Sequence, residues 1–223
     1  MRRFVLLLTA MAVVLVVTSG VAVAVSKIGT NGPDTLRGTN GNDDLLGRAG
    51  NDNLFSLDGR DNLLGGAGKD NVWGGTERRP GEGDKNLQGG PGNDRVLGGR
   101  GSDSLLGEEG NDLVDGGQGS DKIMGGDGAT DVLIDGPFRE TAHDTLSGGD
   151  GGDFIVVDNR TAYKDVVACG DGYDRVVADR KDAVADDCEE VAVGPAAIKE
   201  LFESLPPGAE EEFEEELPPL PEG

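Results

Sequence analysis

Aspartate recurs every nine residues near the start of the chain, in a setting that could bind metal ions. Each of the first five repeats has a glycine two positions before the aspartate and an aliphatic residue two positions after it. Hard divalent cations such as calcium prefer oxygen ligands, and glycine permits the positive φ angles of a tight turn around an ion. The repeat therefore predicts a row of sites for hard divalent cations. The predicted ligands are Asp34, Asp43, Asp52, Asp61, Asp70, Asp94, Asp103, Asp112, Asp121, Asp144 and Asp153.

The complete repeat reads Gly-Gly-x-Gly-x-Asp-x-aliphatic, as in GGAGKDNV, which ends at Val72, and GGPGNDRV, which ends at Val96. Its glycines allow the backbone to approach an ion closely. The turn glycines include Gly66, Gly68, Gly90, Gly92, Gly99, Gly101, Gly117 and Gly119.

A fixed short period is typical of a solenoid, in which each unit buries its apolar residue only by stacking on its neighbours. The residues that follow each aspartate are enough for a very short strand. We expect stacked strands to pair in parallel and to place the aliphatic residues in one inner column. That column is Leu36, Leu45, Leu54, Leu63, Val72, Leu87, Val96, Leu105, Val114, Ile123, Leu133, Leu146 and Ile155.

These motifs resemble the nonapeptide repeats of the RTX (hemolysin-type) calcium-binding family over residues 32–158. The resemblance implies an all-β fold, a right-handed parallel β-roll in which two nonapeptides make one full coil. It also implies that aspartates two repeats apart share an ion and that the backbone of the turn glycines named above supplies further ligands, giving about six to eight ions in all. The implied pairs are Asp34 with Asp52, Asp43 with Asp61, Asp52 with Asp70, Asp94 with Asp112, and Asp103 with Asp121.

The sequence departs from the pattern at two insertions, near residues 76–82 and 137–142. We expect the first insertion to break the inner column into two arrays. Lys85 stands where the pattern has aspartate, and Asp131 follows a spacing of ten. We therefore assign no ion beside Lys85 or Asp131.

The two ends of the chain differ from the repeats. Two arginines and a long apolar run, followed by Ala22-Val23-Ala24, indicate a signal peptide over residues 1–24, with a linker at 25–31. Export to the cell exterior or cell surface follows. The alternative is an uncleaved membrane anchor, since residues 4–25 are nearly long enough to span a bilayer.

Cys169 and Cys188 are the only cysteines, and in an exported chain they favour one disulfide over two free thiols or an intermolecular bridge. Residues 159–194 retain short strand signals but lose the glycine pairs, so we expect a β cap there. Residues 195–223 are expected to form a short helix, over 196–205, and a disordered tail rich in proline and glutamate.

Composition narrows the function further. A formal net charge of −23 argues against nucleic-acid binding. His143 is the only histidine, and no Gly-x-Ser-x-Gly motif is present, so the sequence predicts no enzyme. No apolar segment after Val25 could insert into a membrane.

We therefore expect an exported, monomeric calcium-binding module that folds on binding calcium and has a structural or interaction role. An unknown cell-surface or matrix protein could be its partner. The alternatives are a cytolysin-like or adhesion component at the cell surface and an unrecognised hydrolase.

Overall fold

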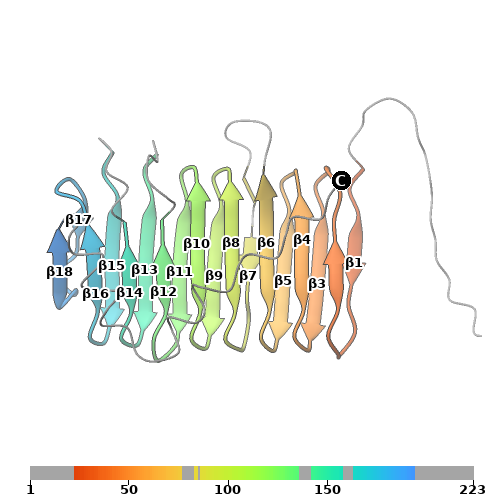
Figure 1. The fold of residues 1–223 in the computed structure, drawn as a ribbon, viewed down its shortest axis with the longest axis horizontal. Coiled ribbons are helices and arrows are strands. Elements are labelled where there is room, and N and C mark those ends of the chain that lie inside the picture. Colours follow the sequence, from red (N-terminus) through yellow and green to blue (C-terminus); the bar gives the residue numbers. More distant parts are fainter. Residues whose placement is uncertain (1–22, 77–82, 85, 136–141, 158–162, 194–223) are drawn as a thin grey trace, which may run out of the picture.

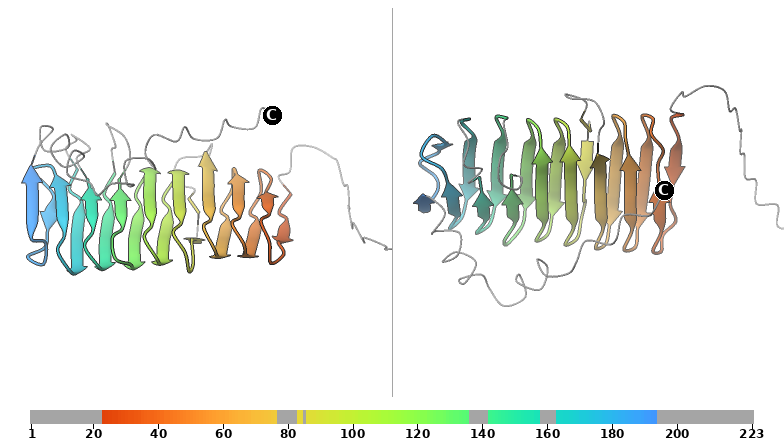
Figure 2. Two further views of the ribbon diagram at one scale, coloured as in Figure 1. Left: turned by 60° about the horizontal axis from the view of Figure 1, so that its bottom comes forward. Right: turned by 45° about the horizontal axis from the view of Figure 1, so that its top comes forward.

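In the computed structural model, the chain winds into a solenoid with two layers of parallel strands (Figure 1). The structure describes residues 23–76, 83–84, 86–135, 142–157 and 163–193. Successive strands alternate between two nine-stranded sheets, so that each strand pairs with the second strand before and after it. Figure 2 shows the two layers from further directions. The predicted all-β solenoid, with two repeats per coil, is confirmed.

The first sheet holds the odd-numbered strands and the second sheet holds the even-numbered strands. The first sheet contains β1 (Ser26–Ile28), β3 (Asp44–Ala49), β5 (Asn62–Ala67), β7 (Asn86–Gln88), β9 (Ser104–Glu109), β11 (Lys122–Asp127), β13 (Thr145–Asp150), β15 (Val166–Asp171) and β17 (Ala183–Val184). The second contains β2 (Thr35–Arg37), β4 (Asn53–Leu57), β6 (Asn71–Thr76), β8 (Arg95–Arg100), β10 (Leu113–Gln118), β12 (Val132–Ile134), β14 (Phe154–Val156), β16 (Arg175–Ala178) and β18 (Glu190–Val193).

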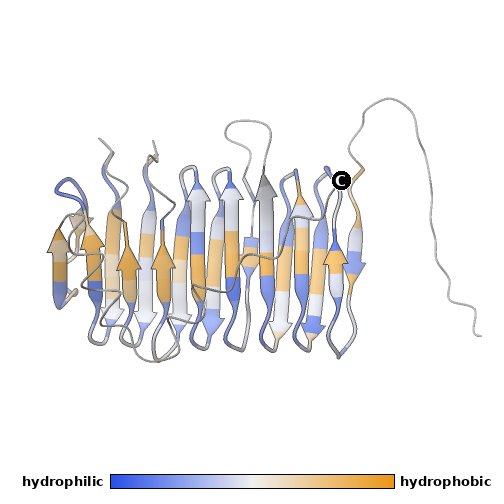
Figure 3. Cartoon of the chain, in the orientation of Figure 1, coloured by the Kyte–Doolittle hydropathy of each residue, from blue (hydrophilic) through white to orange (hydrophobic). Residues whose placement is uncertain are grey.

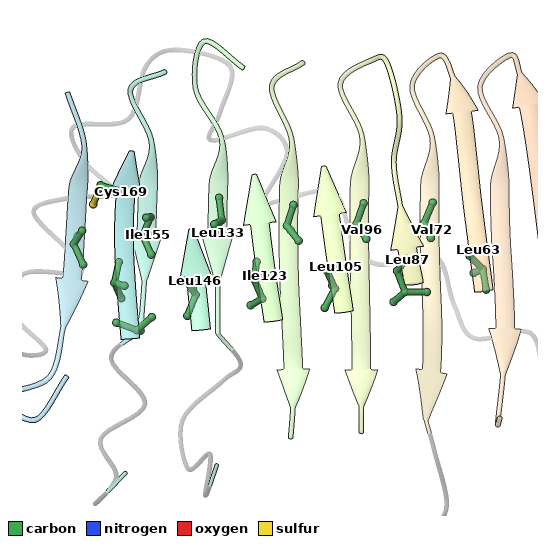
Figure 4. Packing of buried hydrophobic residues seen from close by; sticks show 14 of the residues in the cluster. Leu63, Val72, Leu87, Val96, Leu105, Ile123, Leu133, Leu146, Ile155 and Cys169 are labelled. Carbon is green, nitrogen blue, oxygen red and sulfur yellow. The ribbon is translucent and has the colours of Figure 1, made fainter. Parts of the chain in front are cut away.

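The predicted inner column forms the core between the sheets. Its members point into the space between the two layers and stack along the long axis (Figure 4). From Leu45 to Ile155 all are buried, whereas Leu36, near the first end, is only partly buried. Because the side chains of a strand alternate between faces, one buried position per strand is enough to line this narrow interior. Val167 and Val176 continue the column beyond the predicted repeats.

The first insertion does not divide the column into two arrays, which corrects the expectation from sequence. β6 pairs directly with β8 and places Val72 beside Val96. β7 likewise lies between β5 and β9 in the other sheet. The extra residues fall between strands, so the register of the strands on either side is retained.

Beyond residue 158 the described chain continues the same architecture. β15 and β17 extend the first sheet, and β16 and β18 extend the second. Several even-numbered strands towards this end, including β14 and β16, are coloured hydrophobic over much of their length (Figure 3). The predicted disulfide between Cys169 and Cys188 is present in this region.

Several expectations lie outside the described residues. They are the helix at 196–205, the tail that follows it, and nearly all of the predicted signal peptide. Among the residues that the structure describes, no helix is long and apolar enough to cross a membrane.

Candidate metal sites

Two rows of aspartates run along the solenoid, one leading into each sheet. Within a row, the backbone N–H of each aspartate donates a hydrogen bond to Oδ1 of the aspartate one coil further on. The N–H of Asp52 donates to Asp70 at 2.7 Å, for example, and that of Asp94 donates to Asp112 at 2.8 Å. All five aspartate pairs expected from sequence are joined in this way.

The rows also contain aspartates that the sequence analysis left out. Oδ1 of Asp84 accepts a hydrogen bond from the N–H of Asp61, and the N–H of Asp84 donates to Oδ1 of Asp103. Asp84 therefore takes the row position that the sequence analysis had given to Lys85. That assignment was wrong because one extra residue lies between Asp84 and the column residue Leu87. Asp131 likewise lies between Asp112 and Asp153.

The rows then run on past the repeats. Asp165 follows Asp144, and Asp174 follows Asp153. The sequence did carry a signal for these two residues, since each stands two positions before a valine of the column. These two residues were left out of the predicted ligands because their repeats lack the glycine pair.

One oxygen of most row aspartates is buried without a hydrogen bond. While Oδ1 accepts the N–H of the preceding coil, Oδ2 is enclosed and has no donor. A buried carboxylate oxygen left in this state is costly unless a cation neutralises it. This holds for Asp52, Asp61, Asp70, Asp84, Asp94, Asp112, Asp131, Asp153 and Asp174.

Burial raises the pKa of several row carboxyl groups in the absence of metal. The pKa of Asp84, Asp94 and Asp131 is raised to about 7, with burial as the largest cause. Hydrogen bonds from the backbone lower the pKa, and neighbouring carboxylates of the row raise it. A nearby divalent cation would favour the charged form instead.

The first glycine of each repeat leaves open the space into which Oδ2 points. A Cβ added at Gly47 would lie 2.4 Å from Oδ2 of Asp52 and 2.3 Å from the carbonyl oxygen of Gly65 in the next coil. At Gly65 the corresponding distances, to Asp70 and Gly89, are both 2.6 Å. We call this space, between the first-position residue, the aspartate Oδ2 and the next coil's carbonyl oxygen, the cradle of the repeat.

The predicted backbone ligands lie in the same turns. All eight have positive φ, as at Gly66 (110°) and Gly68 (141°). A Cβ at Gly66 would lie 2.1 Å from the carbonyl oxygen of Arg48 in the preceding coil, so only glycine allows this approach. Carboxylate and carbonyl oxygens around an open space form the donor set that calcium takes, and these residues fit the ion.

A comparison with protein-family models identifies RTX calcium-binding nonapeptide repeats in this chain. The matches cover residues 28–63, 48–77, 81–114, 88–123, 98–132 and 141–159, together more than half of the chain. The protein belongs to the RTX calcium-binding repeat family. A comparison with curated proteins and one with solved structures gave no match. The RTX β-roll is a calcium-binding, non-catalytic module.

One cradle of the RTX roll contains an additional carboxylate. Asp135 stands at the first position of its repeat, where most repeats have glycine, and is buried. Carboxylate oxygens of Asp121, Asp135 and Asp144 lie within 4.8 Å of one another, and together these three residues could hold a metal ion.

Towards the C-terminal end of the RTX roll, apolar side chains fill the first position. Val157, Cys169 and Ala178 take the place of glycine, are buried, and belong to the hydrophobic core. Cys169 is tied to Cys188, with the two Cα atoms 5.3 Å apart. The cradles at this end are closed, so the last coils are held by apolar packing and a covalent bond.

Proposed function

We propose that this chain is an exported RTX module whose roll folds as several calcium ions bind between successive coils. The observation that carries the proposal is the pair of aspartate rows, whose buried Oδ2 atoms face open glycine cradles. Calcium bound there would neutralise the carboxylates and link each coil to the next. The role that follows is structural, because calcium would stabilise the roll as a rigid rod that is disfavoured without the ion.

Electrostatics support folding on calcium binding. The chain carries a formal net charge of −23, and winding it into a roll stacks carboxylates one coil apart in two buried rows. In the unfolded chain the same carboxylates are hydrated and separated. About six to eight divalent ions would supply a charge of roughly +12 to +16, which offsets at least half of that charge.

The proposed ligands are the aspartates and turn glycines predicted from sequence, together with two further residues. Asp84 and Asp131 join them because each stands within a row and has a buried Oδ2 without a donor. The aspartates supply one carboxylate oxygen each, and the turns supply carbonyl oxygens.

Export is supported by the sequence at the N-terminus, where an arginine pair precedes a long apolar run and a small-x-small motif. It also agrees with the disulfide, since such bonds persist in oxidising compartments. Sequencing the N-terminus of the protein recovered from the culture medium would test this part. A chain that stays in the membrane fraction with residue 1 intact would show an anchor instead.

Isothermal titration of the refolded chain with calcium tests the function. We expect about six to eight ions to bind cooperatively, and magnesium to bind far more weakly because it loses its water ligands reluctantly. Metal analysis of the dialysed protein gives an independent count. A chain that takes up no calcium would contradict the proposal.

A further inference from the structure

The first position of each repeat decides whether a cradle is open. Glycine stands there in most repeats, and its two hydrogens leave the space beside Oδ2 clear. At Gly107, for instance, an added Cβ would lie 2.3 Å from Oδ2 of Asp112 and 2.6 Å from the carbonyl oxygen of Gly125. Since van der Waals contacts between such atoms are much longer, any side chain at this position must take up the cradle itself.

Ser56 is the exception in the first half of the roll. It stands five residues before Asp61, where the neighbouring repeats have Gly47 and Gly65. Its side chain is fully buried. Its hydroxyl donates a hydrogen bond to the carbonyl oxygen of Gly74, the first-position residue one coil further on, and lies 3.4 Å from the carbonyl oxygen of Trp73.

The Asp61 carboxylate forms the other side of the cradle. Oδ2 of Asp61 is buried beside Ser56 and, like the Oδ2 atoms of the neighbouring repeats, has no hydrogen-bond partner. The serine side chain thus lies in the space that a cation would take between the Asp61 carboxylate and the Gly74 carbonyl, and its one hydroxyl proton is given to the carbonyl.

We propose that Ser56 closes the cradle of Asp61, so that its hydroxyl replaces a calcium ion and this repeat binds none. The inference rests on the proposed function, because it concerns which cradles of the roll take an ion, and it removes Asp61 from the ligands proposed there. Asp61 stays in its row, where its Oδ1 accepts the N–H of Asp43 at 2.7 Å. The coil is kept in register by this hydrogen bond and by the serine, without metal.

A side chain at the second position of the repeat does not close the cradle. Arg48, Leu57 and Glu108 all replace the second glycine and adopt positive φ, at 87°, 87° and 84°. The repeats of Arg48 and Glu108 keep glycine at the first position, so their cradles remain open. Of these three repeats, only that of Leu57 also carries a side chain at the first position, which is Ser56.

The calcium stoichiometry of S56G tests the proposal. We expect this variant of the full chain, refolded in calcium, to bind one ion more than the wild type in equilibrium dialysis. S56A keeps the Cβ in the cradle, so it should bind the same number as the wild type. G65S introduces the serine in a neighbouring cradle and should bind one ion fewer. E108G changes a second position and should leave the number unchanged.

An S56G chain that binds the same number of ions as the wild type, or fewer, would overturn the proposal, since it would mean that Ser56 itself is a ligand or a bystander. Failure of S56G to fold in calcium, judged by circular dichroism, would count against it equally, because the ion is expected to take the place of the hydroxyl. If the wild type itself binds no calcium, the proposed function fails instead, and the two failures are distinguishable.

Discussion

Each buried aspartate of the two rows uses its two oxygens differently. Oδ1 accepts the N–H of the aspartate one coil before it, and Oδ2 faces the cradle. The side chain therefore fixes the register of neighbouring coils and presents a charge to the same space. A substitution in a row should affect the coils on both sides of it.

Replacing Asp112 by alanine tests this double role. The N–H of Asp94 would lose its acceptor, and the cradle beside Gly107 would lose its carboxylate. We expect fewer bound ions and a loss of about 1.4 kcal/mol of stability for each lost site with tenfold calcium over its Kd. Calorimetry and urea unfolding in calcium would measure both. The matched control is Asp127→Ala, because Asp127 is exposed. Equal effects of the two substitutions would contradict the row assignment.

The pH dependence follows from the raised pKa of Asp84, Asp94 and Asp131, about 7 in the calcium-free roll. An unfolded aspartate has a pKa of about 3.9, so the folded state binds these protons more tightly. The calcium-free roll should therefore lose stability as the pH rises from about 4 to about 7.

Calcium competes with the same protons, so its affinity should rise over this pH range and binding should release protons. Titrations at pH 5.5, 6.5 and 7.5, in buffers that differ in ionisation enthalpy, would measure both effects. Calcium affinity that does not change with pH would contradict the burial of these carboxyl groups.

The strands are short and alike, and each strand from β3 to β16 contributes one buried side chain to the column. The nine-residue period predicts this column correctly, because the face that a residue takes depends on its distance from the turn. It fails at Asp84 and Asp131, where the turn gains a residue while the strand stays in register. The strands after residue 163 were harder to predict as part of the roll, since valine and cysteine replace the glycines there.

A core substitution within one strand should be costly even though ions link the coils. Leu105 is fully buried in β9, between Leu87 and Ile123 of the neighbouring strands. We expect Leu105→Ala to lower the free energy of unfolding in saturating calcium by about 2–5 kcal/mol. Leu106→Ala, on the outer face of the same strand, is the control and should cost much less. Urea unfolding midpoints decide between them, and similar losses would contradict the inner column.

At the scale of the whole molecule, the roll is a narrow rod with a thin apolar interior and a large negative charge. Its two ends differ: open glycine cradles fill most of its length, whereas apolar side chains and the disulfide hold the last coils. The overall fold could be predicted from the period because a solenoid repeats one local solution. The period does not predict which cradles are closed, because closure depends on the side chain at a single position of each repeat.

The most direct measurement is circular dichroism of the refolded chain in calcium and then in excess EDTA. If calcium links the coils, the β-sheet spectrum should be present with calcium, be lost in chelator and return when calcium is restored. Magnesium in place of calcium is the control and should not restore it. The same β-sheet spectrum in EDTA as in calcium would show that the roll is stable without the ion, and would contradict the central claim.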